Sequence, residues 1–435
     1  MNRAAPIPAS AVASLPWGAW HGDARLDLDF PRGWEVEIAP SPSAPALDPQ
    51  AVIRAIRSPV GSPPLSELAA GKASAAIAVD DLSRPAAVPA VLDALWQELK
   101  AAGLKADAVR IVVASGSHRP LERRELHLKL GAEAMGRHPI YGHHPFENLA
   151  DTGVLLGKVP LRVNRFFHEA QLRIGVSTVT PHPFAGFSGG AKIVLPGLAS
   201  LDVLERTHKF VLMGLRGGIG AVDGNRFREE AEDAVRAFGL HFSVNLVVNG
   251  RRAVAGLAAG DLRDAHRAAV EIARRVYAAP CSSPGSAPSS APKSDGADAV
   301  VLNAYPKDMD LIQADFAFNP LRWLPGLVKP EGVVVLTSAC PLGRGVHGLF
   351  EPGMRLHRKP SARGFLGGRT LLVHSPELSA FDFHDLYWEG YELHGEWRTL
   401  RERLEGLLPG SRRVLVFPCA PIQIPVLAPG RREGA

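Results

Sequence analysis

The chain has 435 residues, too many for one small domain, because domains typically hold about 150 residues. Hydrophobic residues make up 46% and charged residues 21%, which is typical of a globular protein and excludes a disordered chain, a collagen and a coiled coil. The formal net charge of +5 comes from 49 basic and 44 acidic residues, and only 7% of residues are aromatic. Nucleic-acid-binding proteins cluster basic residues with interleaved aromatic ones, so we expect no nucleic-acid partner.

The sequence also argues against a membrane or secreted protein. It holds no run of about 18 apolar residues that would span a membrane, and its first residues lack the compact apolar core of a signal peptide. The three cysteines, Cys281, Cys340 and Cys419, lie far apart and form neither a disulfide framework nor a CxxC metal site. We therefore expect a cytoplasmic protein with no membrane contact, in which Cys281 is the exposed thiol.

Short apolar runs alternate with helical patterns along the chain. The predicted strands are residues 75–79, 109–114, 172–177 and 243–248, and then 299–302, 332–336, 370–373 and 413–417. Predicted helices include residues 261–276 and an apolar stripe of Trp397, Leu400, Leu404 and Leu407. Continuous apolar strands that alternate with helices indicate parallel sheets covered on both faces. The predicted fold class is therefore α/β, with two domains whose sheets are mostly parallel.

A segment rich in serine, proline and glycine, residues 279–297, separates the two groups of strands. Such a composition cannot bury enough apolar surface to offset the entropy of ordering, so we expect a flexible linker. The prediction is a larger N-terminal domain of residues 1–278, which carries the candidate site residues, and a smaller C-terminal domain of residues 298–435.

Ligands of open α/β sheets bind beyond the carboxyl ends of the strands, and three predicted strand ends carry unusual polar sequences. The first is residues 80–85, Asp-Asp-Leu-Ser-Arg-Pro. Its aspartates suit the cap of a following helix, and Pro85 suits a first helical position. Arg84 is not explained by capping, because a guanidinium fork also matches a carboxylate or phosphate. Capping and ligand binding both remain open for this loop.

The second loop is residues 115–120, Ser-Gly-Ser-His-Arg-Pro. Its small residues let the backbone approach a ligand, and His118 is a candidate general base because the pKa of imidazole lies near neutral pH. The alternative is a turn with an exposed histidine.

The third loop, residues 180–197, holds His182, the run Ser188, Gly189 and Gly190, and then Lys192. Successive backbone N–H groups at Ser-Gly-Gly can cradle an anion, and Lys192 can pair with it or attack an electrophile. The loop is not a Walker A motif, because Lys192 is followed by isoleucine rather than serine or threonine. A structural glycine turn is the alternative.

His208 follows Lys192 on a predicted helix and shares one face with Leu201, Leu204 and Leu212. Its imidazole should therefore point inward, either as a hydrogen-bonded core residue or as a metal ligand. The sequence has neither HExxH nor CxxC, so a metal carried by an organic cofactor and completed by one histidine fits better than a metal held by protein groups alone. His347 is among the histidines that show no partner pattern.

These motifs together resemble the lactate racemase family, the nickel-pincer nucleotide-dependent 2-hydroxyacid racemases and epimerases. The matching segments are DDLSRP, SGSHRP, PHPFAGFSGGAKIVLPG, THKF, GDLRDAHRAAV and YPKDMDLIQADFAF, in the family's order over residues 75–318. The resemblance implies a larger N-terminal and a smaller C-terminal α/β domain with the active site in the cleft between them.

The resemblance also assigns roles to single residues. Lys192 matches the lysine that forms a thioamide link to the nickel-pincer nucleotide, nickel pyridinium-3,5-bisthiocarboxylic acid mononucleotide. His208 matches the nickel ligand, and Arg84 and Gln313 match substrate-binding residues. The residues assigned to the reaction are the acid/base pair His118 and His182, and those assigned to cofactor binding besides Lys192 are Asp81, Ser188, Gly189 and Gly190.

The implied reaction explains these residue types. Transferring hydride from a 2-hydroxyacid to the cofactor, while a base takes the hydroxyl proton, avoids building negative charge next to the carboxylate. A racemase must accept either enantiomer, so it needs one base on each side of the carbon, and two histidines meet that need. The implied partners are a small 2-hydroxyacid substrate and the proteins that make the cofactor.

Two positions depart from the family pattern. Phe316 stands where lactate racemases have a lysine, and Leu342 stands where an acidic residue is expected. Losing a cation and adding a ring favours a substrate other than lactate, unless Lys307 or Lys209 replaces the charge. The alternatives are a non-catalytic nucleotide- or anion-binding protein on the same scaffold and a hydrolase with a metal held by His118, His182 and His208.

Overall fold

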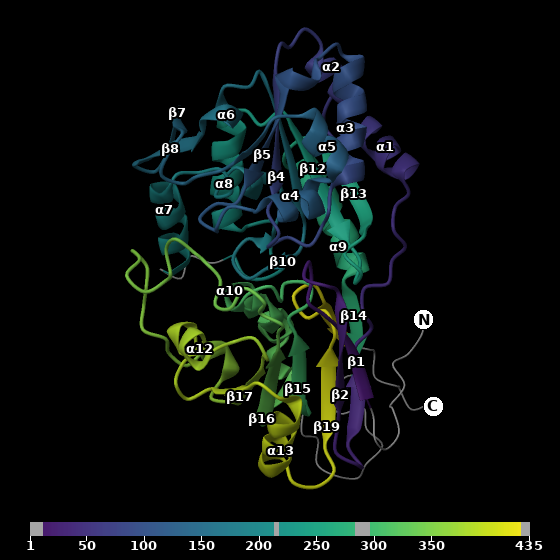
Figure 1. The fold of residues 1–435 in the computed structure, drawn as a ribbon, viewed down its shortest axis with the longest axis vertical. Helices are drawn as coiled ribbons and strands as arrows, with labels where there is room; N and C mark the ends of the chain where they lie inside the picture. Colours follow the sequence, from purple (N-terminus) through teal and green to yellow (C-terminus); the bar gives the residue numbers. More distant parts are fainter. Residues whose placement is uncertain (1–11, 213–216, 283–295, 428–435) are drawn as a thin grey trace. The chain divides into compact units, whose positions relative to one another are not determined.

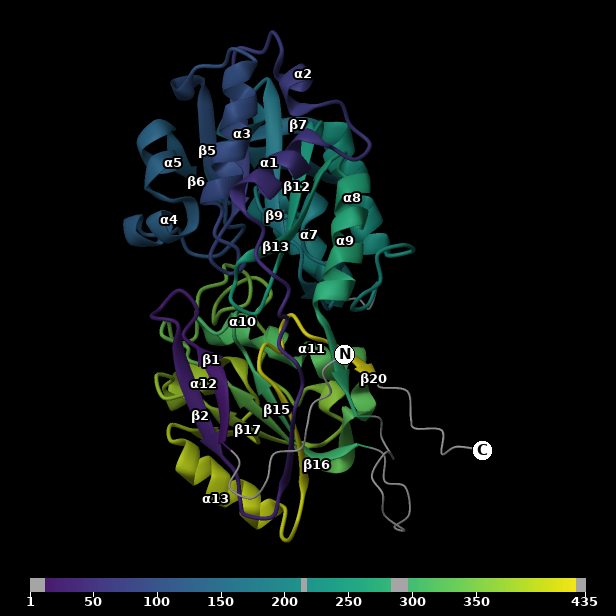
Figure 2. The same cartoon turned by 90° about the vertical axis from the view of Figure 1, so that its right-hand side faces the viewer.

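The computed structural model describes residues 12–212, 217–282 and 296–427. The chain forms two compact units, shown in Figures 1 and 2. Unit 1 comprises Met1–Ser43, Tyr277–Gly345 and Arg358–Ala435, and unit 2 comprises Ala44–Val276 and Val346–His357.

Unit 2 is built on a six-stranded sheet in the order β13-β12-β9-β4-β5-β6. The strands are β4 (Ala75–Asp80), β5 (Val109–Ala114), β6 (Ile140–Gly142), β9 (Leu172–Thr178), β12 (Phe242–Val248) and β13 (Val254–Gly260). All neighbouring pairs are parallel except β12 with β13. The predicted strands of this half are thus confirmed within one or two residues, and an antiparallel strand closes one edge.

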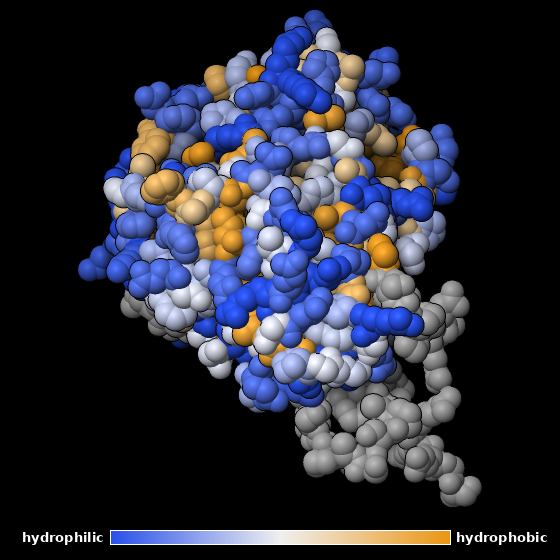
Figure 3. All heavy atoms as spheres, turned by 60° about the horizontal axis from the view of Figure 1, so that its bottom comes forward, coloured by the Kyte–Doolittle hydropathy of each residue, from blue (hydrophilic) through white to orange (hydrophobic). Residues whose placement is uncertain are grey.

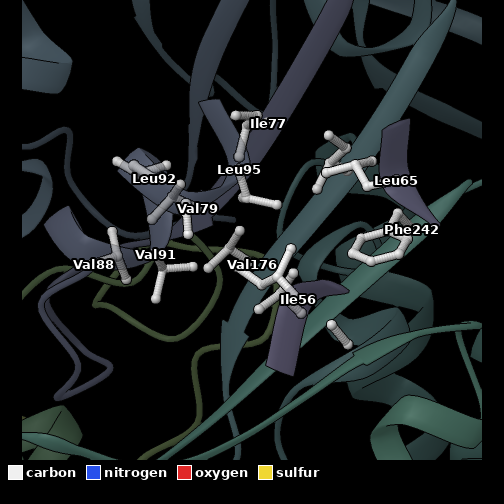
Figure 4. Close-up of a cluster of buried hydrophobic side chains, with 14 of the residues drawn as sticks. Ile56, Leu65, Ile77, Val79, Val88, Val91, Leu92, Leu95, Val176 and Phe242 are labelled. Atoms are coloured by element: carbon white, nitrogen blue, oxygen red, sulfur yellow. The ribbon is translucent and has the colours of Figure 1, made fainter. Parts of the chain in front are cut away.

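Helices cover both faces of this sheet because its central strands are apolar on both sides. In β4, Ile77 and Val79 enter one buried cluster, whereas Ala76 and Ala78 enter another, as the period of two in a strand requires. Figure 4 shows the first cluster, in which Leu92 and Leu95 of α3 pack towards Val79. The helices of this unit are α1 (Pro49–Arg57), α2 (Leu65–Ala69), α3 (Pro89–Ala101), α4 (Arg123–Leu130), α5 (Ala132–Arg137), α6 (Arg165–His168), α7 (Leu201–Leu212), α8 (Arg226–Phe238) and α9 (Asp264–Val276).

Two small antiparallel ribbons complete unit 2. They are β7 (Leu149–Leu156) with β8 (Val159–Asn164), and the short hairpin β10 (Pro181–His182) with β11 (Gly186–Phe187). The hairpin directly follows β9, so it begins at the carboxyl end of a central strand.

A buried ion pair ties the end of β4 to its surroundings. Lys129 Nζ donates to Asp80 Oδ1 at 2.5 Å and to the carbonyl of Ala86 at 2.7 Å, and the Thr178 N–H donates to Asp80 Oδ2 at 2.6 Å. Both charged side chains are shielded from water, since Lys129 is 0% exposed and Asp80 is 7% exposed. The pair therefore fixes the loop after β4 against β9 and α4.

Replacing Lys129 with methionine should destabilise the protein by about 3 kcal/mol or more, because it leaves the Asp80 carboxylate buried without its cation. Urea unfolding would measure the change, with the exposed Lys100→Met as the matched control, for which we expect a change within about 0.5 kcal/mol. Equal stability of the two variants would contradict a structural role for the buried pair.

Unit 1 is built on a second six-stranded sheet, entirely parallel, in the order β18-β17-β16-β15-β19-β3. Its strands are β3 (Glu35–Ile38), β15 (Ala297–Asn303), β16 (Val328–Thr337), β17 (Thr370–His374), β18 (Glu392–His394) and β19 (Arg413–Phe417). Helices α10 (Leu311–Ala314), α11 (Asn319–Trp323) and α12 (Ala380–Leu386) contribute to one buried cluster. Helix α13 (Trp397–Leu407) and the hairpin of β1 (Val12–Trp17) and β2 (Ala24–Asp29) contribute to the other. The α/β class with mostly parallel sheets is confirmed for both units.

The observed units differ from the predicted domain boundaries at three places, one of which is Val346–His357, a part of the predicted C-terminal domain that belongs to unit 2. Strand β3 pairs with β19, so the first residues of the chain belong with the C-terminal sheet rather than with the range 1–278. Strand β14 (Ala278–Cys281), at the start of the predicted linker, pairs with β20 (Ile424–Leu427), and Cys281 is buried rather than exposed. Most of the predicted linker, residues 283–295, lies outside the described residues.

No helix in the described part of the chain combines the length and apolar character that a membrane span needs. On the face drawn in Figure 3, hydrophilic residues surround small hydrophobic patches. Among the described residues, the most exposed large apolar side chains are Phe381, Leu155 and Phe146. Single exposed apolar residues of this kind are normal for a protein surface.

Candidate active site

The three polar loops predicted from the sequence follow neighbouring strands of unit 2. Residues 80–85 follow β4, residues 115–120 follow β5 and residues 180–192 follow β9, and these strands are adjacent in the order β9-β4-β5. Because all three run parallel, their carboxyl ends share one edge of the sheet. The loops therefore meet where ligands of α/β sheets bind.

The first two loops are joined by a hydrogen bond between Asp81 and His118. Asp81 Oδ2 lies 2.8 Å from Nδ1 of His118, and Asp81 Oδ1 accepts the N–H of Ser83 at 3.1 Å and its hydroxyl. Burial by itself would raise the pKa of Asp81, but His118, Ser83 and the charge of Arg84 outweigh it and hold that pKa well below its ordinary value. An ionised Asp81 thus keeps the imidazole proton on Nδ1 and leaves Nε2 as the basic nitrogen of His118.

This contact corrects the capping interpretation of the first loop. The N-cap of α3 is Val88, which makes no side-chain cap, and Pro89 rather than Pro85 occupies the first turn. Asp80 pairs with Lys129 and Asp81 with His118, so neither aspartate caps the helix. The sequence analysis did not predict the Asp81–His118 contact. Because β4 and β5 are parallel neighbours, the loops that follow them are expected to meet.

His182 has the opposite hydrogen-bonding arrangement. Its Nδ1 accepts the N–H groups of Phe184 and Ala185, each at 3.2 Å. A neutral imidazole that accepts at Nδ1 carries its proton on Nε2. At Nε2, His182 is therefore set as a proton donor, whereas His118 is set as a proton acceptor.

The hairpin that carries His182 is held from α8. The buried Arg228 donates from Nε to the carbonyl of Ala185 at 3.0 Å and also to the carbonyl of Phe187. Asn225, the N-cap of α8, donates to the carbonyl of Phe184 at 2.9 Å. These bonds fix the short hairpin, whose two strands alone supply few backbone contacts.

Polar groups of the Ser-Gly-Gly run form hydrogen bonds with other parts of the protein. Ser188 Oγ donates to the carbonyl of Thr178 at 2.7 Å, and the Gly190 N–H donates to Asn245 Oδ1 at 2.8 Å. Gly190 has φ of 60°, and a Cβ there would lie 3.0 Å from the ring of His266, so only glycine fits this turn. The structure thus gives Ser188 and Gly190 a packing role, and the assignment of Ser188, Gly189 and Gly190 to cofactor binding stays a prediction.

Lys192 lies half-buried on the short helix that follows. Its Nζ lies 5.2 Å from the ring centroid of Phe227, and no hydrogen-bond acceptor or carboxylate within the described ranges contacts it. Burial, followed by the positive charges of Arg84 and Arg228, lowers the pKa of Lys192 to about 7. Lys192 is therefore partly a neutral amine at physiological pH, the form that acts as a nucleophile.

The lowered pKa of Lys192 predicts unusual reactivity towards amine-modifying reagents. Because its neutral fraction rises with pH through about 7, its labelling rate should level off above about pH 8, whereas a free lysine side chain continues to gain reactivity up to about pH 10. Competitive labelling followed by mass spectrometry would measure the profile, with Nα-acetyllysine as the reference compound. A Lys192 profile parallel to that of Nα-acetyllysine would contradict the effect of its surroundings.

His208 lies on α7 with a defined ring orientation. Its Nδ1 donates to the carbonyl of Leu204, one turn earlier, at 2.7 Å, which leaves Nε2 as an acceptor. Burial, and then the nearby charges of Lys192 and His118, lower the pKa of His208 to about 4 despite the bond to Leu204. A neutral histidine that donates its other ring nitrogen to a backbone carbonyl is the usual form of a metal ligand.

Sequence reasoning missed His347, which the fold places in unit 2 beside His118 and His208. The ring centroid of His347 lies 5.6 Å from that of His118 and 5.4 Å from that of His208. Its hydrogen-bond partner Ser117 is 230 residues away in the chain, so no local pattern could reveal this position. No group of three or more His, Cys, Asp or Glu side chains among the described residues is arranged to hold a metal ion.

Gln313 and the two departing positions lie in unit 1. Gln313 is buried on α10, and its N–H donates to Asp310 Oδ1 at 2.8 Å. Phe316 is covered by Lys307, whose Nζ lies 4.2 Å from the ring centroid. Lys307 is 1% exposed, so a buried cation stands directly against the ring that replaces the family lysine. The position of the active site between the two domains stays a prediction.

The fold and these loops define an α/β protein in which lysine and histidine side chains gather at the carboxyl ends of parallel strands. Residues 21–219 match the sequence model of the lactate racemase N-terminal domain family. The lactate racemase of Thermoanaerobacterium thermosaccharolyticum is 25% identical over 340 residues, 76% of each chain. That of Lactiplantibacillus plantarum is 28% identical over 343 residues, 78% of this chain and 77% of the relative. The resemblance predicted from the motifs is confirmed: the chain is similar to the lactate racemases in sequence and in its N-terminal domain model.

Solved structures give the same result for the fold. The lactate racemase apoprotein from Thermoanaerobacterium thermosaccharolyticum matches with a TM-score of 0.70 at 21% identity, covering 96% of this chain and 100% of that one. A crystal structure of a protein from Thermotoga maritima matches with a TM-score of 0.62 at 19% identity, covering 88% of this chain and 99% of that one.

Proposed function

We propose that this protein is a racemase or epimerase of a 2-hydroxyacid. The observation that carries the proposal is the opposite arrangement of two histidines, His118 with a basic Nε2 and His182 with a protonated Nε2. Inversion of a carbon that bears a hydroxyl requires one group to accept the hydroxyl proton and another to supply a proton on the opposite side. The relatives named as lactate racemases support the same class of reaction.

The residues present fit a nickel-pincer nucleotide. Lys192 offers an amine that burial keeps partly neutral, as a covalent link to the cofactor requires. His208 offers Nε2 as a ligand atom, because its Nδ1 is bonded to the Leu204 carbonyl. When bound, this cofactor would supply reversible acceptance of hydride from C2 of the substrate. The partners that this proposal implies are the proteins that make and deliver the cofactor.

The residues of the chain would act on the substrate in a definite order. Arg84 would bind the substrate carboxylate through its planar guanidinium, and Gln313 stays a predicted substrate-binding residue. His118 Nε2 would take the hydroxyl proton when C2 is oxidised to the planar 2-oxoacid level. His182 would give its Nε2 proton to the oxygen when the hydroxyl is formed again. Asp81 would stabilise the imidazolium of His118 while that proton is held.

The substrate should differ from lactate at the end remote from the carboxylate. Phe316 stands where the family pattern has a lysine, so an aromatic ring takes the place of a cation. The ammonium of Lys307 lies against that ring. An ammonium on an aromatic face is stabilised by the ring, so the charge of Lys307 is held against Phe316. We therefore propose a 2-hydroxyacid with a side chain larger than methyl.

A panel of single-enantiomer 2-hydroxyacids, given to protein produced together with the cofactor biosynthesis proteins, tests the function. Loss of optical rotation should be fastest for acids with side chains of three or more carbons and slower for lactate. The apoprotein is the control and should leave every rotation unchanged. Tight binding of the acids by the loaded protein with no loss of rotation would instead indicate a non-catalytic anion-binding protein.

A further inference from the structure

His347 reaches unit 2 on a segment of the C-terminal half of the chain, residues 346–357. The Gly348 N–H donates to the carbonyl of Ser117 at 3.0 Å, and Leu349 and Leu356 enter the same buried cluster as β4 and α7. At the far end, Arg355 forms ion pairs with two acidic side chains of α7. The segment is thus packed on the loop that carries His118 and on the helix that carries His208.

The imidazole of His347 lies between these two histidines. It meets the His118 ring at an interplanar angle of 68° and the His208 ring at 78°, both edge-on. Edge-to-face contacts of this kind are directional, because the positive edge of one ring faces the negative face of the other. Rotation of either neighbouring ring would therefore break its contact with His347.

The orientation of His347 is itself fixed. Its Nδ1 accepts the backbone N–H of Leu349 at 3.3 Å and lies 3.3 Å from Ser117 Oγ. The backbone N–H of His347 donates to Glu351 Oε1 at 2.6 Å. The ring also packs on Phe350, with centroids 4.7 Å apart. His347 is 8% exposed, so water does not compete for these contacts.

We propose that His347 is a positioning residue, which holds the rings of His118 and His208 in the directions that they need as base and ligand. The inference rests on the proposed function for those two roles. Its physical basis is that the His347 ring contacts one ring from the loop after β5 and one ring from helix α7, so that Nε2 of each keeps a constant direction. Misplacing a reacting group by about 1 Å costs on the order of 100-fold in rate.

The test compares His347→Ala with His347→Phe, which keeps a ring of similar shape. Long-range proton–nitrogen spectra of the apoprotein report the tautomers and ring environments of His118 and His208 without any cofactor. We expect His347→Ala to shift or broaden both sets of signals and, in the loaded protein, to lower kcat about 10- to 100-fold with KM nearly unchanged. His347→Phe should retain the parent signals and a kcat within about 3-fold of the parent, because it restores the edge contacts.

The control is Arg355→Ala, which weakens docking of the same segment through half-exposed ion pairs and leaves the rings in place. It should leave both the spectra and kcat unchanged.

If His347→Ala does not fold, His347→Asn removes the ring while keeping an acceptor for the Leu349 N–H, and the same shifts are expected. Unchanged His118 and His208 signals without the ring, or a His347→Phe variant as impaired as His347→Ala, would overturn the proposal. If the parent fails to racemise any acid, the proposed function fails, whereas the apoprotein spectra still decide the role of His347.

Discussion

Replacing Asp81 with asparagine should lower kcat about 1,000-fold or more while KM changes little. The Asp81 carboxylate accepts the Nδ1 proton of His118 and so leaves Nε2 basic. An asparagine amide can turn its NH2 group towards Nδ1, and the imidazole proton then moves to Nε2. The geometry of the site is retained, but His118 can no longer accept the hydroxyl proton of the substrate.

Two measurements separate this effect from general damage. Proton–nitrogen spectra of the Asp81→Asn apoprotein should show the His118 proton on Nε2, and thermal unfolding should show a folded protein. The matched control is Asp93→Asn, which removes a half-exposed carboxylate that pairs with Arg137 on the surface, and it should keep the parent activity. An Asp81→Asn variant with full activity would exclude His118 as the base.

Replacing His208 with alanine should lower the nickel content of the loaded protein and lower activity at least about 100-fold, since even outer partners of metal ligands contribute 10- to 100-fold. The reason is that His208 Nε2 is held as an acceptor by the Nδ1 bond to Leu204. Nickel content by elemental analysis and the visible absorption of the cofactor would measure the loss.

Lys209→Ala is the control for this variant. Lys209 is the next residue on α7, is exposed and pairs with Glu205, so its loss leaves the ring of His208 in place. It should keep nickel and absorption at the parent level. Retention of nickel and activity by His208→Ala would show that the metal, if present, is held elsewhere.

Much of unit 2 could be predicted because its central strands are short apolar runs that end in polar loops. In β4 and β5 every residue but one is buried, so the hydrophobic pattern determines the strands directly. The loops after them then meet because neighbouring parallel strands end at one edge. That reasoning places Asp81 and His118 near each other, but their hydrogen bond is seen only in the folded structure.

What escaped prediction depends on contacts between distant parts of the chain. Strand β3 joins the C-terminal sheet through β19, more than 370 residues later, and a single sequence holds no sign of that pairing. The position of His347 likewise depends on contacts with Ser117, His118 and His208, which are distant in sequence. The close approach of Gly190 to the ring of His266 likewise joins distant parts of the chain and leaves no mark in the local sequence.

The most direct test of the whole account is racemisation of a single-enantiomer 2-hydroxyacid that carries deuterium at C2, by the loaded protein in ordinary water. If hydride leaves and returns while His118 and His182 handle only the hydroxyl proton, the inverted product should keep its deuterium. Replacement of that deuterium by solvent hydrogen in the inverted product would mean that a proton is removed from carbon, which would contradict the roles assigned to both histidines.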